Sequence, residues 1–389
     1  MGLAHAKLMR FHRFPTVCLQ RFLNAAPGPK RISEAQHIVH AARELGFLHV
    51  ENTPLTPAVI ERALRAVRWL MQSPPAQKQR CSVLPAPNAG FGSAIASMGA
   101  REGGRGYYRY VGAAQQGDNI EAFQIGNDST SVAALRRPYY EEIGMPEDIW
   151  LAEASQCNRW PPTEASDAME TSCAGRSGGD ALRDSGCDAA EFREAILAYW
   201  QAAEACTTHM LEVVELGLGL TPHCLRQAHT RADHTFEAKR YPQLRASTDD
   251  GHGLLRVAPH ADQSTLTLLT QDTEGGLEVL SGVGGASSAS NASSPGESRT
   301  QEEWLRVPAQ ERAILVNVGN FLERWTCGAL PSTLHRVVGN GSADKPDRER
   351  ISLVFFAQPN WDASMHPLIA VEAPCGRDDD NMAGDLMPF

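Results

Sequence analysis

The sequence lacks the features of membrane-spanning and nucleic-acid-binding proteins. Charged residues interrupt every apolar run well before the roughly 18 to 20 residues that a membrane-spanning helix requires. Lys and Arg total 36 against 46 Asp and Glu, a net charge of −10, and the chain therefore has no broad excess of positive charge. We accordingly expect neither a membrane nor a nucleic acid among its partners.

The nine cysteines are scattered, and none forms a C-x-x-C pair. Their odd number excludes complete internal pairing, which favours reduced thiols in an intracellular compartment. The N-terminus also lacks the apolar core of a secretory signal, and we therefore expect a cytoplasmic protein. Residues 1–33 are basic and contain no acidic side chain, the pattern of a mitochondrial presequence, so a mitochondrial location is the alternative.

The composition is that of a folded globular chain, with 42% hydrophobic and 21% charged residues over 389 positions. Such a length corresponds to one large domain or two ordinary ones. Two stretches, 163–187 and 281–303, are small, polar and without periodicity, and we expect disordered insertions there. The segment 376–389 has the same character and is predicted to be a mobile acidic tail.

The first half of the chain has helical patterns with recognisable start signals. Ser33 precedes an apolar repeat as a capping-box residue, and Gly46 is expected to stop that helix. Thr56, followed by a proline, is expected to cap a second helix. Asp188 opens the pattern of a long supporting helix over 188–220.

From about Thr235 the chain changes to short β-rich runs separated by Gly, Pro and Asn, such as STLTLLTQ, AILVNVG and RISLVFFAQ. This rhythm predicts an antiparallel sandwich or jelly roll. The polar segment 281–303 falls between two of these runs, where a hairpin loop can absorb extra length at small entropic cost. We therefore expect an α+β protein with a mainly β core.

A possible metal site begins in HADQSTLTLLT, where His260 and Asp262 stand two residues apart. On a strand this spacing places both side chains on one face. His335 lies in a later β run, and two histidines with one carboxylate occupy one face of an octahedral metal, which suits non-haem Fe(II) oxygen chemistry. A closed structural zinc site would require a fourth protein ligand, and the sequence shows no evident candidate for one. The alternative is chance, since His49 and Glu51 show the same spacing and are interpreted as a surface or interface pair.

Arg350 and Ser352 also stand two residues apart in a β run. The guanidinium matches a carboxylate bidentately, and its burial is costly without an anion. An internal salt bridge is one explanation. The other is a ligand, because Arg350 follows His335 by 15 residues (350 − 335), on the next strand. A bound dicarboxylate could chelate the metal at one end and contact Arg350 at the other.

Taken in order, these motifs resemble those of the isopenicillin N synthase-like Fe(II)/2-oxoglutarate-dependent dioxygenases. The similarity extends from Phe14 to Pro359 and includes VNVGNFLERWTCGALPSTLHRVV before the distal histidine and KRYP upstream. It implies a double-stranded β-helix, or jelly roll, over 231–360 and a helical and strand region over 14–130 packed around it. It further implies that Tyr241 contacts 2-oxoglutarate, together with Arg350 and Ser352.

The resemblance implies three cofactors or co-substrates: Fe(II) on His260, Asp262 and His335, 2-oxoglutarate, and O2. The reaction would oxidise a small organic metabolite, by hydroxylation or desaturation, with release of succinate and CO2. Two positions depart from the family pattern: Lys239 stands where many plant members have Asn, and Asn320 stands where Asp is usual. Either residue could touch the co-substrate or a group that supports a metal ligand.

Two other functions remain open on the sequence alone. Some members of the same family are Fe(II)-dependent oxidases that retain R-x-S without using 2-oxoglutarate. A jelly-roll protein could also bind a small ligand without turnover. The basic, aromatic segment 101–112 is either a lid over the pocket or an ordinary loop and strand. Neither the substrate nor the oligomeric state is predicted.

Overall fold

The computed structural model describes residues 14–82, 105–111, 119–127, 158–163, 187–231, 234–243, 255–281, 303–339, 347–360 and 363–369. The predicted insertions 163–187 and 281–303 lie outside these residues except at their ends, and the predicted tail 376–389 lies wholly outside them. Residues 1–13 also lie outside them. Of the segment 101–112, for which the sequence left a lid or an ordinary loop and strand open, residues 105–111 are described, and Tyr107–Val111 form a strand. In the described part of the chain, no helix is both long and apolar enough to cross a membrane.

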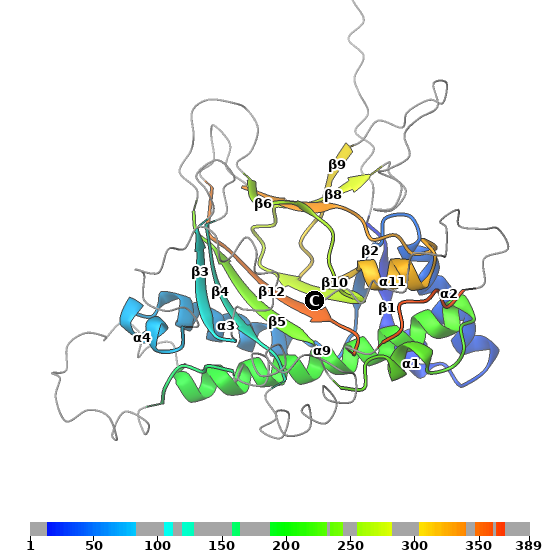
Figure 1. The fold of residues 1–389 in the computed structure, drawn as a ribbon, viewed down its shortest axis with the longest axis horizontal. Coiled ribbons are helices and arrows are strands. Elements are labelled where there is room, and N and C mark those ends of the chain that lie inside the picture. The colour runs from blue at the N-terminus through cyan, green and yellow to red at the C-terminus, as the bar shows by residue number, and fades with distance from the viewer. Residues whose placement is uncertain are drawn as a thin grey trace, which may run out of the picture.

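Two β-sheets face each other (Figure 1). The larger sheet has eight strands, in spatial order β1 (Thr16–Cys18), β2 (Phe47–Glu51), β10 (Ala313–Val318), β7 (Leu266–Gln271), β12 (Arg350–Ala357), β5 (Thr235–Tyr241), β4 (Asn119–Ile125) and β3 (Tyr107–Val111). The smaller sheet has four, in the order β6 (Leu255–His260), β11 (His335–Val338), β8 (Leu277–Ser281) and β9 (Glu303–Arg306). The β1–β2 pair is parallel and the other pairs in these sheets are antiparallel.

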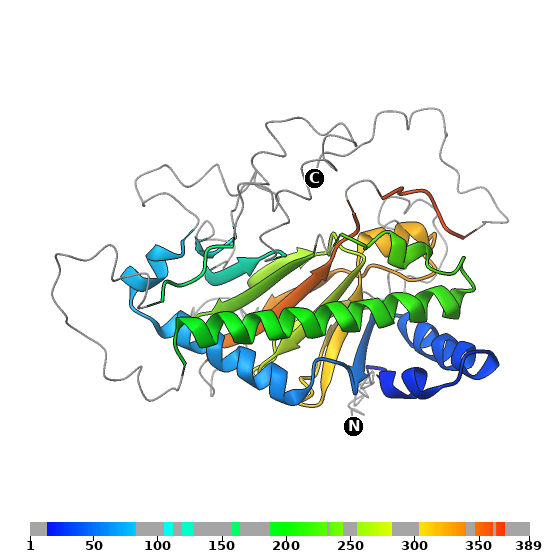
Figure 2. The ribbon, with the colours of Figure 1, turned by 90° about the horizontal axis from the view of Figure 1, so that it is seen from below.

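A helical layer lies on the outer face of the larger sheet. The described helices are α1 (Leu19–Asn24), α2 (Pro29–Ala42), α3 (Pro57–Gln72), α4 (Pro75–Arg80), α9 (Ala189–Leu218), α10 (Cys224–Gln227) and α11 (Asn320–Trp325). Helix α9 runs across the strands of this sheet, and α2 and α3 pack beside it (Figure 2). The two facing sheets with helices packed against the larger one confirm the predicted α+β fold with a jelly-roll core.

Two of the predicted helix starts are confirmed, and one is wrong. Thr56 accepts a hydrogen bond from the Val59 amide at 3.4 Å, and Asp188 accepts one from the Glu191 amide at 2.8 Å. Helix α2, however, begins at Pro29 with Gly28 as its N-cap, and Ser33 lies inside it. Proline at the first helical position has the required φ already, so the helix starts there in place of the later serine.

Gly46 forms the turn between α2 and β2, although the helix ends earlier, at Ala42. Its φ of +63° lies in the left-handed region, and a Cβ at this position would come within 1.9 Å of the Pro331 carbonyl oxygen. Only glycine therefore lets the start of β2 lie against the segment that leads into β11 and His335.

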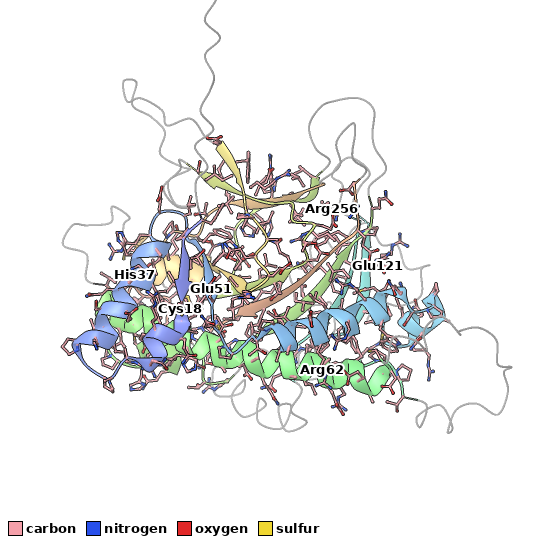
Figure 3. The ribbon with its side chains drawn as sticks, turned by 180° about the vertical axis from the view of Figure 1, so that it is seen from behind. Cys18, His37, Glu51, Arg62, Glu121 and Arg256 are labelled. Atoms are coloured by element: carbon pink, nitrogen blue, oxygen red, sulfur yellow. The ribbon has the colours of Figure 1, made fainter. Side chains whose placement is uncertain are left out.

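The side chains of β12 alternate between the two faces of the larger sheet. Ile351, Leu353 and Phe355 belong to the core between this sheet and the helices. Val354 belongs to a second apolar cluster, between the two sheets, and Arg350 and Ser352 point to that same inner face. Figure 3 shows side chains between the sheets, with Arg256 on the smaller sheet and Arg62 in the helical layer. The functional side chains described below lie on this inner face.

Strand β9 was not predicted, and of β6 only its end at His260 was placed on a strand. Strand β6 contains Pro259, which reads as a breaker, but β6 is an edge strand, where proline costs no ladder bond. Strand β9 follows the predicted insertion, and its first residue, Glu303, pairs with Ser281 of β8. The segment 282–302 therefore connects two adjacent antiparallel strands.

The interpretation of His49 as a surface or interface residue is wrong. Its side chain is buried, with Nε2 3.1 Å from the Pro308 carbonyl oxygen and Nδ1 3.3 Å from the Gln310 amide nitrogen. Burial lowers the pKa of this imidazole. His49 is thus a core histidine with its polar atoms satisfied by its neighbours.

Candidate active site

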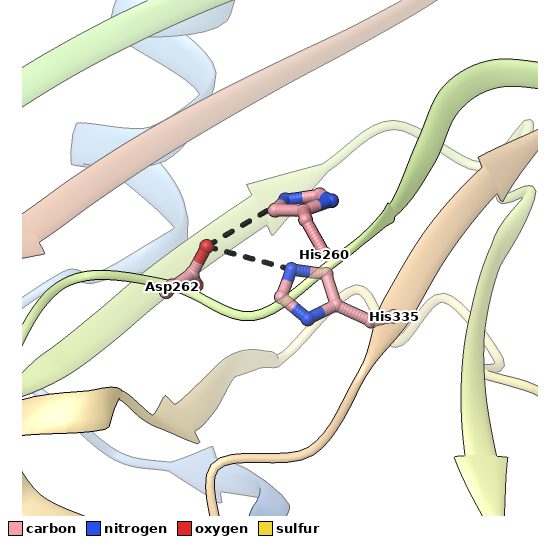
Figure 4. Close-up of side chains that lie close together, drawn as sticks. All are labelled: His260, Asp262 and His335. Carbon is pink, nitrogen blue, oxygen red and sulfur yellow. Dashed lines mark ion pairs between the residues drawn. The ribbon is translucent and has the colours of Figure 1, made fainter. Parts of the chain in front are cut away.

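His260, Asp262 and His335 converge at one end of the space between the sheets (Figure 4). His260 ends β6, His335 begins β11, and the two residues are directly paired across the antiparallel strands. Oδ1 of Asp262 lies 3.7 Å from Nε2 of His260 and 3.5 Å from Nε2 of His335. One ligand atom from each residue lies within 4.8 Å of the others, and no fourth candidate ligand joins them among the described residues.

The strand-parity argument for His260 and Asp262 is wrong in one respect. Strand β6 ends at His260, and Asp262 lies in the connection to β7. The carboxylate reaches the histidines because this connection crosses between the sheets and is held by the Asn320 amide, which donates to the Asp262 carbonyl oxygen at 2.9 Å. The two-residue spacing therefore brings His260 and Asp262 together because Asp262 lies in a loop, and not because both residues share one face of a strand.

Two neighbouring side chains fix the orientation of the Asp262 carboxylate. Thr267 donates to Oδ2 at 2.7 Å, and the Asn317 side-chain amide donates to the same oxygen at 2.8 Å. Oδ1 is thereby left to face the two histidines. Sequence reasoning missed both supports, although each is a polar residue on a strand of the β-rich half and lines the cavity.

Backbone carbonyl groups determine which ring nitrogen of each histidine faces Asp262. Nδ1 of His260 lies 2.8 Å from the Ala258 carbonyl oxygen, and Nδ1 of His335 lies 3.2 Å from that of Thr333. A carbonyl oxygen only accepts, so Nδ1 is the donor and Nε2 of a neutral ring directs a lone pair toward Asp262. This tautomer is the one that a metal-binding histidine requires.

The charges of the three groups are compatible with a cation between them. Burial opposes ionisation of Asp262, but interactions with His335, Asn317 and His260 hold its pKa well below the usual value. Burial lowers the pKa of His260, whereas the hydrogen bond and charge of Asp262 outweigh burial at His335 and raise its pKa. Asp262 is therefore an ionised carboxylate that faces both imidazole rings.

Arg350 and Ser352 lie at the other end of the same inner face. The Arg350 side chain is 2% exposed, donates to Ser352 Oγ at 3.4 Å and Gln271 Oε1 at 3.0 Å, and lies 4.8 Å from the ring centre of Tyr241. Its buried Nε has no hydrogen-bond partner among the described residues. The charge of Arg350 acts to lower the pKa of Asp272, but the Asp272 carboxylate accepts its hydrogen bonds from the backbone amides of Glu274 and Ile351. The salt-bridge explanation of Arg350 therefore fails in the described part of the chain.

One cavity joins the two ends. It is open to solvent and is lined by all six residues predicted for the site. Apolar side chains from both sheets complete its walls, including Phe47, Leu269 and Val337. A largely apolar concave site with a few converging polar groups is the usual form of a small-molecule pocket.

The two departures from the family pattern have different positions. Lys239 lines the cavity, whereas Asn320 contacts Asp262 through its backbone amide. The buried Oδ1 of Asn320 has no hydrogen-bond partner among the described residues. Of the two, only Lys239 presents its side chain to the cavity.

Two family models match the chain. The model of the 2OG-Fe(II) oxygenase superfamily covers residues 221–359, and the N-terminal model of non-haem dioxygenases in morphine synthesis covers 14–161. The first match contains all six residues predicted for the site, and together the two models span most of the described residues.

Similar curated proteins carry related names. The "2-oxoglutarate-dependent dioxygenase frbA" of Dothideomycetidae sp. (strain 11243) is 24% identical, over 90% of this chain and 86% of that protein. The validamycin A dioxygenase of Streptomyces hygroscopicus subsp. limoneus is 33% identical, over 46% of this chain and 44% of its own length.

Solved structures show the same fold. The crystal structure of a full-length Neurospora crassa protein in complex with alpha-KG has a TM-score of 0.67 and 18% identity, covering 92% of this chain and 90% of that one. The Arabidopsis thaliana dioxygenase for auxin oxidation 1, in its 2-oxoglutarate complex, has a TM-score of 0.55 and 17% identity, covering 93% and 100%. The chain belongs to the isopenicillin N synthase-like branch of the 2OG-Fe(II) oxygenases and is a 2-oxoglutarate-dependent dioxygenase.

Proposed function

We propose that this enzyme oxidises a small, largely apolar organic metabolite with consumption of 2-oxoglutarate and O2 and release of succinate and CO2. In this assignment His260, Asp262 and His335 hold Fe(II). Arg350, Ser352 and Tyr241 bind the distal carboxylate of 2-oxoglutarate. The observation that supports it best is the buried Arg350 guanidinium, which has no ion-pair partner among the described residues and faces the same cavity as the three candidate ligands.

The donor set fits Fe(II). Two imidazoles and one carboxylate leave three positions of an octahedral ion open, and this set is typical of iron that activates oxygen. When bound, the metal would supply the activation of O2 coupled to decarboxylation of the keto acid. The chain's own contribution is orientation: carbonyl groups fix the imidazole tautomers, while Thr267 and Asn317 fix the carboxylate.

The cavity walls and the exposed edge of the site support a small substrate. His260 is 42% exposed in its side chain, against 9% for His335 and 7% for Asp262. A substrate would therefore approach past His260, while the inner walls exclude water from the Arg350 end. The similar Neurospora crassa protein is also described in complex with thymine, and another similar structure is that of a rice dioxygenase for auxin oxidation. Both descriptions concern small organic molecules.

The test is the production of succinate by the purified enzyme with Fe(II), 2-oxoglutarate and air. We expect succinate from the wild-type protein at a slow uncoupled rate, and no detectable succinate from His335→Ala or Asp262→Ala. A suitable control is His37→Ala, which removes an exposed histidine of α2 remote from the cavity (Figure 3). Retained activity in the site variants would contradict the ligand assignment.

Succinate release together with a measurement of bound iron separates the competing functions. An oxidase that does not use 2-oxoglutarate would bind iron and release no succinate. A binding protein without turnover would release none under any condition and would show no response to added iron. A catalytic metal on a preformed barrel is not the main source of the protein's stability, so each site variant should still fold. The far-UV circular dichroism of each variant checks this.

A further inference from the structure

Lys239 is a cation of the cavity to which the proposed residue roles assign no task. It lies on β5 between Glu237 and Tyr241, and residues at this spacing share one face of a strand. Tyr241 and Lys239 both line the cavity. Across the strand pair, Tyr241 is opposite Arg350 and Lys239 is opposite Ser352. Lys239 therefore lies opposite Ser352, two residues further along β12 than Arg350 and on the same face of the sheet.

The ammonium of Lys239 lies on the metal side of Arg350. Nζ is 5.7 Å from the ring centre of Phe356, which is also a cavity residue. Phe356 is paired in the sheet with Thr267, the residue that donates to Asp262. The lysine side chain therefore reaches along the wall from the level of Ser352 toward the level of the three candidate metal ligands.

A short polar chain holds this lysine in place. Nζ lies 2.7 Å from Oε2 of Glu237, and the other carboxylate oxygen accepts a hydrogen bond from the Tyr108 hydroxyl at 2.8 Å. The Lys239 side chain is 23% exposed, and that of Glu237 is 13% exposed. An ammonium has three donors and Glu237 accepts from one of them, so donors remain for a ligand in the cavity that Lys239 lines.

The charge of Lys239 is preserved. Burial opposes it, but the charge of Glu237 raises the pKa of Lys239 above its usual value, and Asp262 adds to this rise. The same ammonium acts to lower the pKa of both His260 and His335, although Asp262 outweighs it at His335. A fixed positive charge therefore acts on the space beside the candidate metal site, where it favours an anionic ligand group.

We propose that Lys239 binds a carboxylate of an organic ligand on the metal side of Arg350, and that Glu237 and Tyr108 position its side chain for this contact. Such a carboxylate has two possible sources: the keto acid end of 2-oxoglutarate, or an acidic substrate. The inference rests on the proposed function, because it takes the cavity to hold 2-oxoglutarate and substrate beside Fe(II).

The first test measures binding without turnover. Fe(II)-loaded protein is titrated anaerobically with 2-oxoglutarate and with pyruvate, which has the keto acid end and lacks the distal carboxylate. The variants are Lys239→Met, which keeps the chain length and removes the charge, and Lys239→Arg, which keeps the charge. Arg62→Met, in the helical layer of Figure 3, is the matched control for loss of a cation.

If Lys239 holds the keto acid end, Lys239→Met weakens 2-oxoglutarate and pyruvate by a similar factor, roughly 10- to 100-fold for one lost charge-assisted hydrogen bond. Lys239→Arg retains most of the affinity, and Arg62→Met is unchanged. Weakening of 2-oxoglutarate alone would place Lys239 on the distal carboxylate and overturn its position on the metal side.

The second test addresses the substrate. Wild-type protein with Fe(II) and 2-oxoglutarate is titrated by calorimetry with benzoate, phenylacetate and octanoate and with their neutral amides. If Lys239 reads an acidic substrate, the acids bind more tightly than the amides, and this preference disappears in Lys239→Met while 2-oxoglutarate affinity is unchanged.

The inference is overturned if Lys239→Met binds 2-oxoglutarate, pyruvate and every acid of the panel as the wild-type protein does. A wild-type protein that binds neither Fe(II) nor 2-oxoglutarate would instead refute the proposed function. The two failures are therefore distinguished by the wild-type titration alone.

Discussion

Replacement of Arg350 by methionine has two opposite consequences if this arginine is a co-substrate ligand. The side chain is 2% exposed, its hydrogen-bond partners Ser352 and Gln271 are neutral, and its Nε is unpaired among the described residues. A buried charge without a counter-charge is costly, and replacement even of a buried ion pair by apolar side chains of similar volume is often neutral or stabilising by about 1 to 4 kcal/mol. The ligand-free Arg350→Met variant should therefore be at least as stable as the wild-type protein.

The same change should weaken 2-oxoglutarate strongly. Loss of one partner of a buried charge pair costs about 2 to 5 kcal/mol, which is a factor of roughly 30 to 5,000 in the dissociation constant. Part of this cost arises because the distal carboxylate would be buried against Ser352 and Tyr241 without a cation. The expected result is a large rise in the 2-oxoglutarate requirement with no loss of folding free energy.

Two measurements on one preparation test this pair of expectations. Urea unfolding of the metal-free protein gives the stability, and anaerobic titration of the Fe(II) protein gives the 2-oxoglutarate affinity. Arg62→Met, whose guanidinium is 35% exposed and pairs with Glu191, should change stability by less than about 1 kcal/mol and leave affinity unaltered. A variant of Arg350 that loses several kcal/mol of stability and binds 2-oxoglutarate normally would refute the reasoning.

Three further outcomes follow from described contacts. Asn317→Leu removes a donor to the metal-binding carboxylate and should weaken Fe(II) about 10- to 100-fold in competition with a chelator; equal retention would show that this donor is dispensable. Burial lowers the pKa of His229 to about 4 and of His234 to about 3, so the unfolded chain binds more protons below pH 6.5. The free energy of unfolding should fall as pH falls, by about 4 kcal/mol at pH 5, with about half of that loss absent in His234→Gln; a flat urea profile would contradict this. Glu215→Ala leaves the Arg226 guanidinium and several amides without their buried acceptor and should cost about 3 to 5 kcal/mol, measured as a lower Tm, whereas a change under about 1 kcal/mol would mean that water replaces the carboxylate.

Local sequence signals predicted the parts of the fold that depend on a few adjacent residues. Thr56 and Asp188 act as caps because their side chains reach backbone amides three positions on. Ser33 failed because Pro29 already satisfied the requirement for a helix start upstream. Pro259 is tolerated in β6 because this strand lies at a sheet edge, a position that sequence alone does not show.

The sequence predicted which residues form the candidate site more completely than it predicted how they are arranged. His260, Asp262 and His335 do converge, but Asp262 does so from a loop, which the two-residue period of a strand does not describe. Thr267 and Asn317 escaped notice because their role depends on register between strands distant in sequence. The ion pair of Lys239 with Glu237 could be inferred from their shared strand face, but its position beside the cavity could not.

The most direct test of the assigned activity is anaerobic titration of the wild-type protein with Fe(II) and then with 2-oxoglutarate, monitored throughout by visible absorption. We expect one Fe(II) per chain, a weak visible charge-transfer band that appears only with 2-oxoglutarate, and a shift of that band to much higher 2-oxoglutarate concentrations in Arg350→Met. Fe(II) binding with no band at any 2-oxoglutarate concentration would contradict the assignment of the cavity, and absence of Fe(II) binding would contradict the metal site itself.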